Sequence, residues 1–141
     1  MSASDASPRP PGSGIRVLFV DDEQQLVTVT ARLLERQGFR VTAFVDARLA
    51  LDALRADAWA FDVLVTDHNM PALSGLDVAA QARALRAELP VVLTSGYVTE
   101  ELMAQAAAAG IAGVCAKPST LQVLIQAIRD ALAGVPLRAP E

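Results

Sequence analysis

Residues 15–23 read Ile-Arg-Val-Leu-Phe-Val-Asp-Asp-Glu, a short apolar run that ends abruptly in three acidic residues. A near-continuous apolar run of this length is typical of a strand that is buried on both faces of a parallel sheet. The acidic residues then follow the carboxyl end of the strand, where the crevice of an open α/β sheet lies. The stretch therefore predicts a buried strand with a polar site at its end.

Four similar apolar runs follow, and a segment with helical periodicity separates each from the next. The first helical segment places on one face Leu26, Val29, Thr30, Leu33 and Leu34. Five strand–helix units predict an α/β fold in which a five-stranded parallel sheet carries helices on both faces. The strands are expected at residues 15–20, 39–44, 61–66, 91–95 and 114–116.

Capping residues mark the starts of several helices. Asp46 and Thr99 stand where an N-cap is expected, and either Ser119 or Thr120 does so for the last helix. The third helix is expected at residues 73–86.

Length and composition restrict the class of protein. A chain of 141 residues fits one domain, here residues 15–133, with a disordered tail at residues 1–14 and a second tail at residues 134–141. The net charge of −4 argues against nucleic-acid binding by this domain. No apolar run is long enough to span a bilayer, so no membrane contact is expected. The single cysteine, Cys115, fits a reducing compartment, and we expect a cytoplasmic protein.

Polar side chains follow the expected strands and would meet at one edge of the sheet. Three aspartates close together would repel one another, and a divalent cation such as Mg²⁺ (or Mn²⁺) would relieve the repulsion. A carboxylate there could attack phosphorus and form an acyl phosphate, with an ammonium and a hydroxyl binding the phosphoryl group. The polar residues at or just after the ends of the expected strands are Asp21, Asp22, Glu23, Asp67, His68, Asn69, Thr94, Ser95 and Lys117.

Lys117 is the only lysine of the chain, while the other basic residues are arginines. Lysine offers a compact point charge on a flexible stem, which suits contact with a phosphoryl group. A coding bias toward arginine would also leave a single lysine by chance. Asp21 and Asp22 have an alternative reading too, as charges that favour a helix N-terminus, and Asp67 as a turn residue.

Four motifs, in order and at strand ends, together resemble the receiver domains of two-component response regulators. They are residues 20–23 (Val-Asp-Asp-Glu), 65–71 (Val-Thr-Asp-His-Asn-Met-Pro), 93–96 (Leu-Thr-Ser-Gly) and 116–118 (Ala-Lys-Pro). The resemblance covers residues 15–133. It implies a flavodoxin-like fold with strand order 2-1-3-4-5.

The resemblance also implies a role for each site residue. Asp67 is similar to the phospho-accepting aspartate of the family, and Asp21, Asp22 and Asp67 to its metal-binding carboxylates. Asn69 would lend its backbone carbonyl to Mg²⁺. Ser95 falls on the family's Thr/Ser position, and Lys117 would contact the phosphoryl group through a loop whose Lys–Pro bond is often cis.

A receiver is a signalling domain that catalyses only its own phosphorylation and slow dephosphorylation, so the resemblance implies no separate enzyme activity. The implied donor is a sensor histidine kinase or a His-containing phosphotransfer protein, docking near Gln25, Leu26, Val29 and Pro118. The downstream partner stays open, and the domain is expected to be a monomer or a weak dimer.

Two positions depart from the usual pattern of the family. Val114 stands where many receivers carry Tyr or Phe, which leaves the output of the switch open. Tyr97 lies two residues after Ser95, and we hypothesise that its bulk shields the phosphoryl group from water.

Three other functions remain as alternatives at this point. An FMN-binding flavodoxin would share the sheet order, although the acids at residues 21–23 would repel its phosphate. A haloacid dehalogenase-type phosphatase would need a second Asp where Asn69 stands. A degenerate receiver that only binds partners would form no acyl phosphate at Asp67.

Overall fold

The computed structural model describes residues 12–140, which form five strands and five helices in strict alternation. The strands are β1 (Arg16–Val20), β2 (Arg40–Phe44), β3 (Val63–Asp67), β4 (Val91–Ser95) and β5 (Gly113–Ala116). The helices are α1 (Gln24–Arg36), α2 (Ala47–Ala56), α3 (Gly75–Leu85), α4 (Glu100–Ala108) and α5 (Leu121–Ala133).

All five strands pair in parallel and form one sheet in the order β2-β1-β3-β4-β5. The chain therefore reverses its direction of winding between β1 and β3, and β1 and β3 are neighbours. In open sheets this point is where the crevice beyond the strand ends lies. The predicted α/β fold and strand order are both confirmed.

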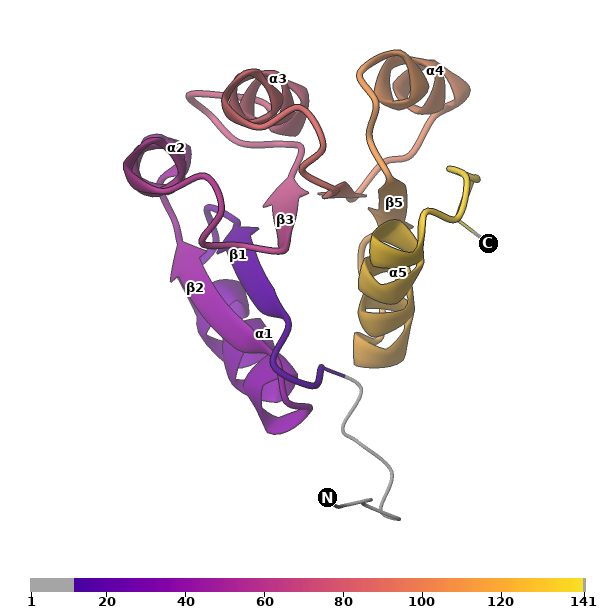
Figure 1. Cartoon of the computed structure of the whole chain (residues 1–141). Coiled ribbons are helices and arrows are strands. Elements are labelled where there is room, and N and C mark those ends of the chain that lie inside the picture. The colour runs from indigo at the N-terminus through magenta and orange to yellow at the C-terminus, as the bar shows by residue number, and fades with distance from the viewer. Residues whose placement is uncertain (1–11, 141) are drawn as a thin grey trace.

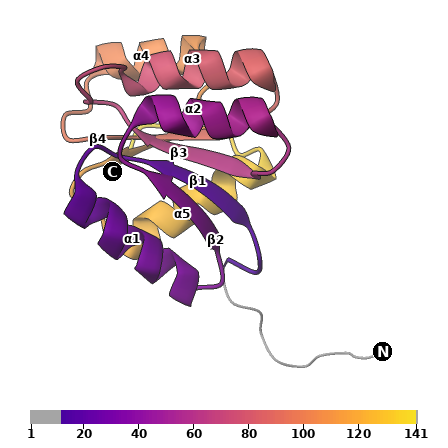
Figure 2. The same cartoon turned by 90° about the vertical axis from the view of Figure 1, so that its left-hand side faces the viewer.

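The sheet lies between two layers of helices (Figures 1 and 2). Helices α2, α3 and α4 cover one face, where the buried cluster includes Leu18, Leu64 and Leu93. Helices α1 and α5 cover the other, where Phe19 and Val65 pack among their side chains. Because successive residues of a strand point to opposite faces, each apolar run contributes to both clusters, which explains why the runs are continuous.

Side-chain caps define where most helices begin. Asp46, Thr99 and Thr120 accept hydrogen bonds from the backbone N–H groups of Arg48, Leu102 and Val123, as N-caps do. The third helix starts at Gly75, two residues later than predicted, because Ser74 and Asp77 form a reciprocal capping box.

The predicted buried face of α1 is partly wrong. Val29 was expected on the apolar stripe, but 54% of its surface is exposed. Val27 and Leu34 are the buried residues of this helix. Apolar residues occupy both sides of the true stripe, so the sequence periodicity does not define its centre.

Residues flanking the expected domain also make contacts. The predicted N-terminal tail lies mostly outside the described residues, but Gly12 and Gly14 donate hydrogen bonds to the carbonyls of Gln37 and Gly38. After α5, Leu137 packs against the cluster under α4. Among the described helices, none is long and apolar enough to cross a membrane.

Candidate functional site

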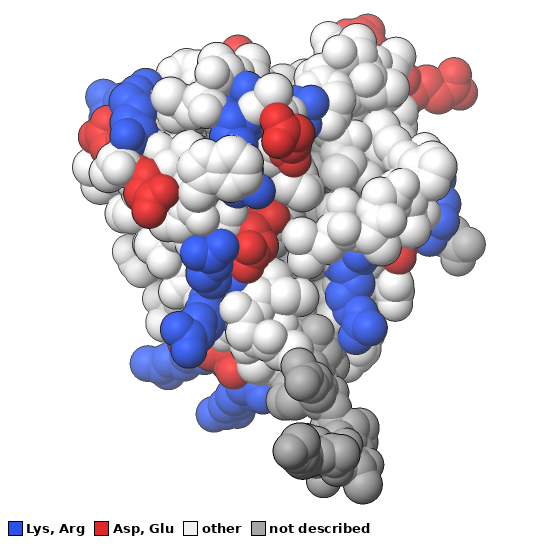
Figure 3. All heavy atoms as spheres, viewed as in Figure 1, with Lys and Arg blue, Asp and Glu red and all other residues white. Residues whose placement is uncertain are grey.

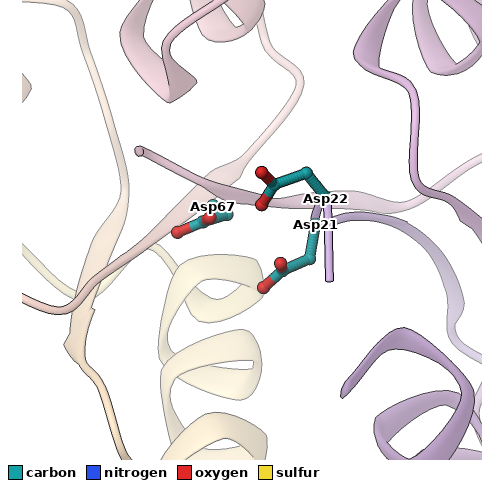
Figure 4. A group of neighbouring side chains, drawn as sticks. All are labelled: Asp21, Asp22 and Asp67. Atoms are coloured by element: carbon teal, nitrogen blue, oxygen red, sulfur yellow. The ribbon is translucent and has the colours of Figure 1, made fainter. Parts of the chain in front are cut away.

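Three carboxylates gather at the carboxyl ends of β1 and β3. Oxygen atoms of Asp21, Asp22 and Asp67 lie within 4.8 Å of one another (Figure 4). Asp21 is fully buried and Asp67 is only 3% exposed, whereas Asp22 is exposed. The predicted convergence of these acids is therefore confirmed as geometry, because β1 and β3 end side by side in the sheet.

Lys117 places its ammonium group within this cluster, and no other ammonium of the described residues lies nearby. Its Nζ donates to Asp21 Oδ2 at 2.7 Å and lies 3.3 Å from Asp67 Oδ1. Glu23 is a more distant and exposed partner, at 3.8 Å. The following Lys117–Pro118 peptide bond is cis, as the resemblance implied. The lone lysine therefore lies within the polar site, so chance codon usage does not account for its position.

The charges of the cluster perturb one another. Burial raises the pKa of the Asp67 carboxyl, and the neighbouring Asp21 raises it further, while Lys117 opposes both effects. Burial lowers the pKa of the Lys117 ammonium, but its contacts with Asp21 and Asp67 outweigh burial and raise that pKa overall. The cluster thus has an excess of negative charge, which an added cation would offset.

We expect Asp67→Asn to stabilise the protein when no divalent cation is present, and increasingly so as the pH rises. The folded-state pKa of Asp67 lies above the ordinary 3.8. The protonated carboxyl therefore contributes its full stabilisation at a pH below 3.8. This contribution disappears as the pH rises through the raised pKa. Urea unfolding in EDTA at several pH values would measure the difference. The exposed Asp22→Asn is the control, with a smaller change; a difference for Asp67→Asn that does not vary with pH would contradict the account.

Ser95 and Asn69 lie beside the carboxylates but bond to each other. The Asn69 side-chain amide donates to Ser95 Oγ at 3.2 Å, and the Ser95 hydroxyl donates to the Tyr97 carbonyl at 3.2 Å. In the described part of the chain, Ser95 makes no hydrogen bond to Asp67. This link between the β3–α3 loop and the end of β4 was not predicted.

Gly75 contributes to the site in a way that sequence reasoning missed. A Cβ atom at this position would lie 2.6 Å from the carbonyl oxygen of Asp67 and 2.8 Å from the Cα of His68. Helix α3 can therefore approach the end of β3 only because residue 75 has no side chain. The sequence showed a glycine near a helix start, but not what it contacts.

An open groove adjoins the carboxylates on the α1 and α5 side. It has a volume of about 520 Å³, and apolar side chains form most of its wall. Lys117 and Asp21 border it at the carboxylate end, and Leu26, Val29 and Pro118 line its length. The exposed Val29 of α1 is thus part of the groove wall.

The residues present suit a hard divalent cation. Carboxylate and carbonyl oxygens are the donors that Mg²⁺ prefers, and it usually keeps several waters beside one or two carboxylates. The cluster supplies one exposed carboxylate, two buried ones and an excess of negative charge. Because no histidine or cysteine belongs to this group, softer metals have no matching donor in it.

Comparison with known proteins identifies the family. The sequence-family model of the response regulator receiver domain matches residues 17–129, which is most of the chain. The chain belongs to this family. The domain that carries the three clustered acids and Lys117 on this sheet is therefore a receiver domain.

Individual relatives of this receiver domain differ in length. The chain is 37% identical over 120 residues to the chemotaxis protein CheY of Pseudomonas aeruginosa, covering 81% of this chain and 93% of CheY. It is 32% identical to the sensory/regulatory protein RpfC of Xanthomonas campestris, covering 82% of this chain but only 16% of RpfC. A receiver domain structure from Clostridium thermocellum superimposes with a TM-score of 0.79 at 27% identity, covering 84% of this chain and 94% of that one.

Proposed function

We propose that this receiver domain accepts a phosphoryl group on Asp67, in a reaction that depends on Mg²⁺. The observation that carries the proposal is the contact of Lys117 with both Asp21 and Asp67 inside a group of three converging carboxylates. An acceptor oxygen, a cation site and a fixed ammonium then lie within reach of one phosphoryl group. Family membership supports the same assignment.

Asp67 is proposed as the nucleophile. One of its carboxylate oxygens attacks phosphorus while the bond from phosphorus to the donor's imidazole nitrogen breaks. When the other ring nitrogen of the donor carries a proton, the products are an acyl phosphate and a neutral imidazole. Bound Mg²⁺ would neutralise charge on the transferred oxygens. Asp21, Asp22, Asp67 and the Asn69 carbonyl are the residues that would hold it. Burial of Asp67 removes water that would otherwise surround the attacking oxygen.

Lys117 is proposed to change its ion-pair partner when Asp67 is phosphorylated. In the resting protein it pairs with Asp21 and Asp67, and a phosphoryl group on Asp67 would offer it a stronger partner. Ser95 would donate its hydroxyl proton to another phosphoryl oxygen. These two movements would change the loops after β4 and β5, where Tyr97 and Pro118 lie, and so switch the binding of a partner.

The groove between α1 and α5 is the proposed docking place of the donor, a sensor histidine kinase or a His-containing phosphotransfer protein. Its apolar wall includes Leu26, Val29 and Pro118, and it ends at Lys117 beside the acceptor. A donor bound along it would bring its histidine to the carboxylates.

On the face seen in Figure 3, acidic and basic side chains are interspersed, which gives no large basic surface for nucleic acid on that side.

Dependence of phosphorylation on Mg²⁺ tests the proposal. We expect incubation with acetyl phosphate and Mg²⁺ to add the mass of one phosphoryl group to the intact protein. Replacing Mg²⁺ by EDTA should remove at least nine-tenths of the product, because the three carboxylates would then repel the incoming anion. Asp22→Ala should need a higher Mg²⁺ concentration. Equal yields with Mg²⁺ and with EDTA would contradict the proposal.

Tyr97 is proposed to slow loss of the phosphoryl group. It lies two residues after Ser95, the last residue of β4, so the chain keeps it near the site even after Ser95 has turned toward the phosphoryl group. Its ring is on the solvent side of the site, because 79% of the residue's surface is exposed to water. Removal of the ring in Tyr97→Ala should raise the rate of autodephosphorylation about threefold, the order of a loss of 0.7 kcal/mol in shielding. Decay of the phosphorylated protein after the donor is removed gives the rate. An unchanged rate would refute the shielding role.

A further inference from the structure

The hydroxyl of Ser95 has no hydrogen-bonding capacity left in the resting protein. Ser95 ends β4 and is fully buried. Its Oγ accepts from the Asn69 amide and from the backbone N–H of Tyr97, each at 3.2 Å, and donates to the Tyr97 carbonyl at 3.2 Å. A serine hydroxyl has one proton and two lone pairs, so all three are used.

This arrangement opposes any movement of Ser95 toward Asp67. The single proton of the hydroxyl cannot bind a phosphoryl oxygen while it binds the Tyr97 carbonyl. The Asn69 amide occupies one lone pair from the side of the β3–α3 loop, which favours the rotamer in which the proton points to Tyr97. Asn69 thereby connects the loop that follows the acceptor Asp67 to Ser95 at the end of β4.

The side chain of Asn69 is free for this role. In the proposed metal site, Asn69 contributes only its backbone carbonyl. Its residue is exposed, so replacing the side chain removes no buried packing. A single neutral hydrogen bond changes an equilibrium by about two- to tenfold.

We propose that Asn69 is a positioning residue whose amide holds the Ser95 hydroxyl on Tyr97 and so sets the resting population of the switch. Without this amide, Ser95 would leave Tyr97 more often before any phosphorylation. The movement of Ser95 on phosphorylation rests on the proposed function, but the contact among Asn69, Ser95 and Tyr97 in the resting protein does not.

The single tyrosine of the chain makes this contact directly observable. Labelling with [¹⁵N]tyrosine gives one backbone amide signal, from the N–H group that donates to Ser95 Oγ. We expect Mg²⁺ with beryllofluoride, a phosphoryl analogue, to move the wild-type amide proton upfield as this bond is lost. In Asn69→Ala without Mg²⁺ or beryllofluoride, the signal should already lie part-way along the same path, with the released population raised about two- to tenfold.

A Ser95→Ala background separates positioning from a general effect on the loop. Once the hydroxyl is absent, Asn69→Ala should leave the Tyr97 signal nearly unchanged. A resting signal in Asn69→Ala that coincides with wild type would overturn the proposal, and so would an equal shift in the Ser95→Ala background. Failure of the proposed function is seen separately, as the absence of a phosphoryl adduct in the mass spectrum, and the two resting comparisons still decide the role of Asn69.

Discussion

Lys117→Met is expected to destabilise the protein by about 3 kcal/mol at neutral pH in EDTA, because removing one partner of a buried ion pair leaves the other charge unpaired. Lys117 Nζ is the partner of Asp21 Oδ2 at 2.7 Å, and Asp21 is fully buried. For a domain of this size the change corresponds to a fall in Tm of about 10 °C. Urea unfolding and thermal melting would measure it.

Two control variants separate the pair from general charge effects. Glu23→Gln removes an exposed partner 3.8 Å from Lys117 and should change stability by less than about 0.5 kcal/mol. Lys117→Arg keeps the positive charge, so we expect it to fold and to accept phosphate but to switch poorly. Added Mg²⁺ should restore stability more in Lys117→Met than in wild type. Equal stability of Lys117→Met and wild type in EDTA would show that the pair does not contribute.

Gly75→Ala is expected to cost about 3 kcal/mol, the upper end of the usual range for overpacking. The new Cβ would meet the Asp67 carbonyl oxygen at 2.6 Å and the His68 Cα at 2.8 Å, and would also press on the side chain of Leu93. Two of these three neighbours are backbone atoms at the acceptor, which cannot rotate away. Helix α3 or the end of β3 must therefore shift, and we expect a lower phosphorylation rate as well.

Gly96→Ala is the matched control for this substitution. Gly96 lies in the loop after β4, also at the carboxyl edge of the sheet, but a Cβ there has no heavy atom within 4 Å. Its expected effect on stability is below about 0.5 kcal/mol. Equal stabilities of Gly75→Ala and Gly96→Ala would contradict the close approach of α3 to β3.

The architecture could be predicted because it follows from patterns that sequence displays directly. Alternating apolar runs and helical stripes predict a parallel sheet, and parallel strands place the residues that follow them at one edge. Asp21, Asp67 and Lys117 therefore could be predicted to meet although 96 positions separate Asp21 from Lys117.

Other features depend on packing that sequence does not display. Val27 and Val29 are equally apolar, so only the contacts of α1 with the sheet decide that Val27 is buried and Val29 lies in the groove. The bond between Asn69 and Ser95 depends on the rotamers of two side chains, one in the β3–α3 loop and one at the end of β4. The need for glycine at position 75 arises from a helix that approaches β3.

Among the three clustered aspartates, Asp67 is the one that we propose receives the phosphoryl group. Borohydride reduces an acyl phosphate to the alcohol, so a phosphorylated aspartate becomes homoserine and its position can be read by peptide mass spectrometry. After treatment with acetyl phosphate and Mg²⁺ followed by borohydride, we predict homoserine at position 67 and none in Asp67→Asn. Homoserine at position 21 or 22 in the wild type, or its absence from all three positions, would contradict the account.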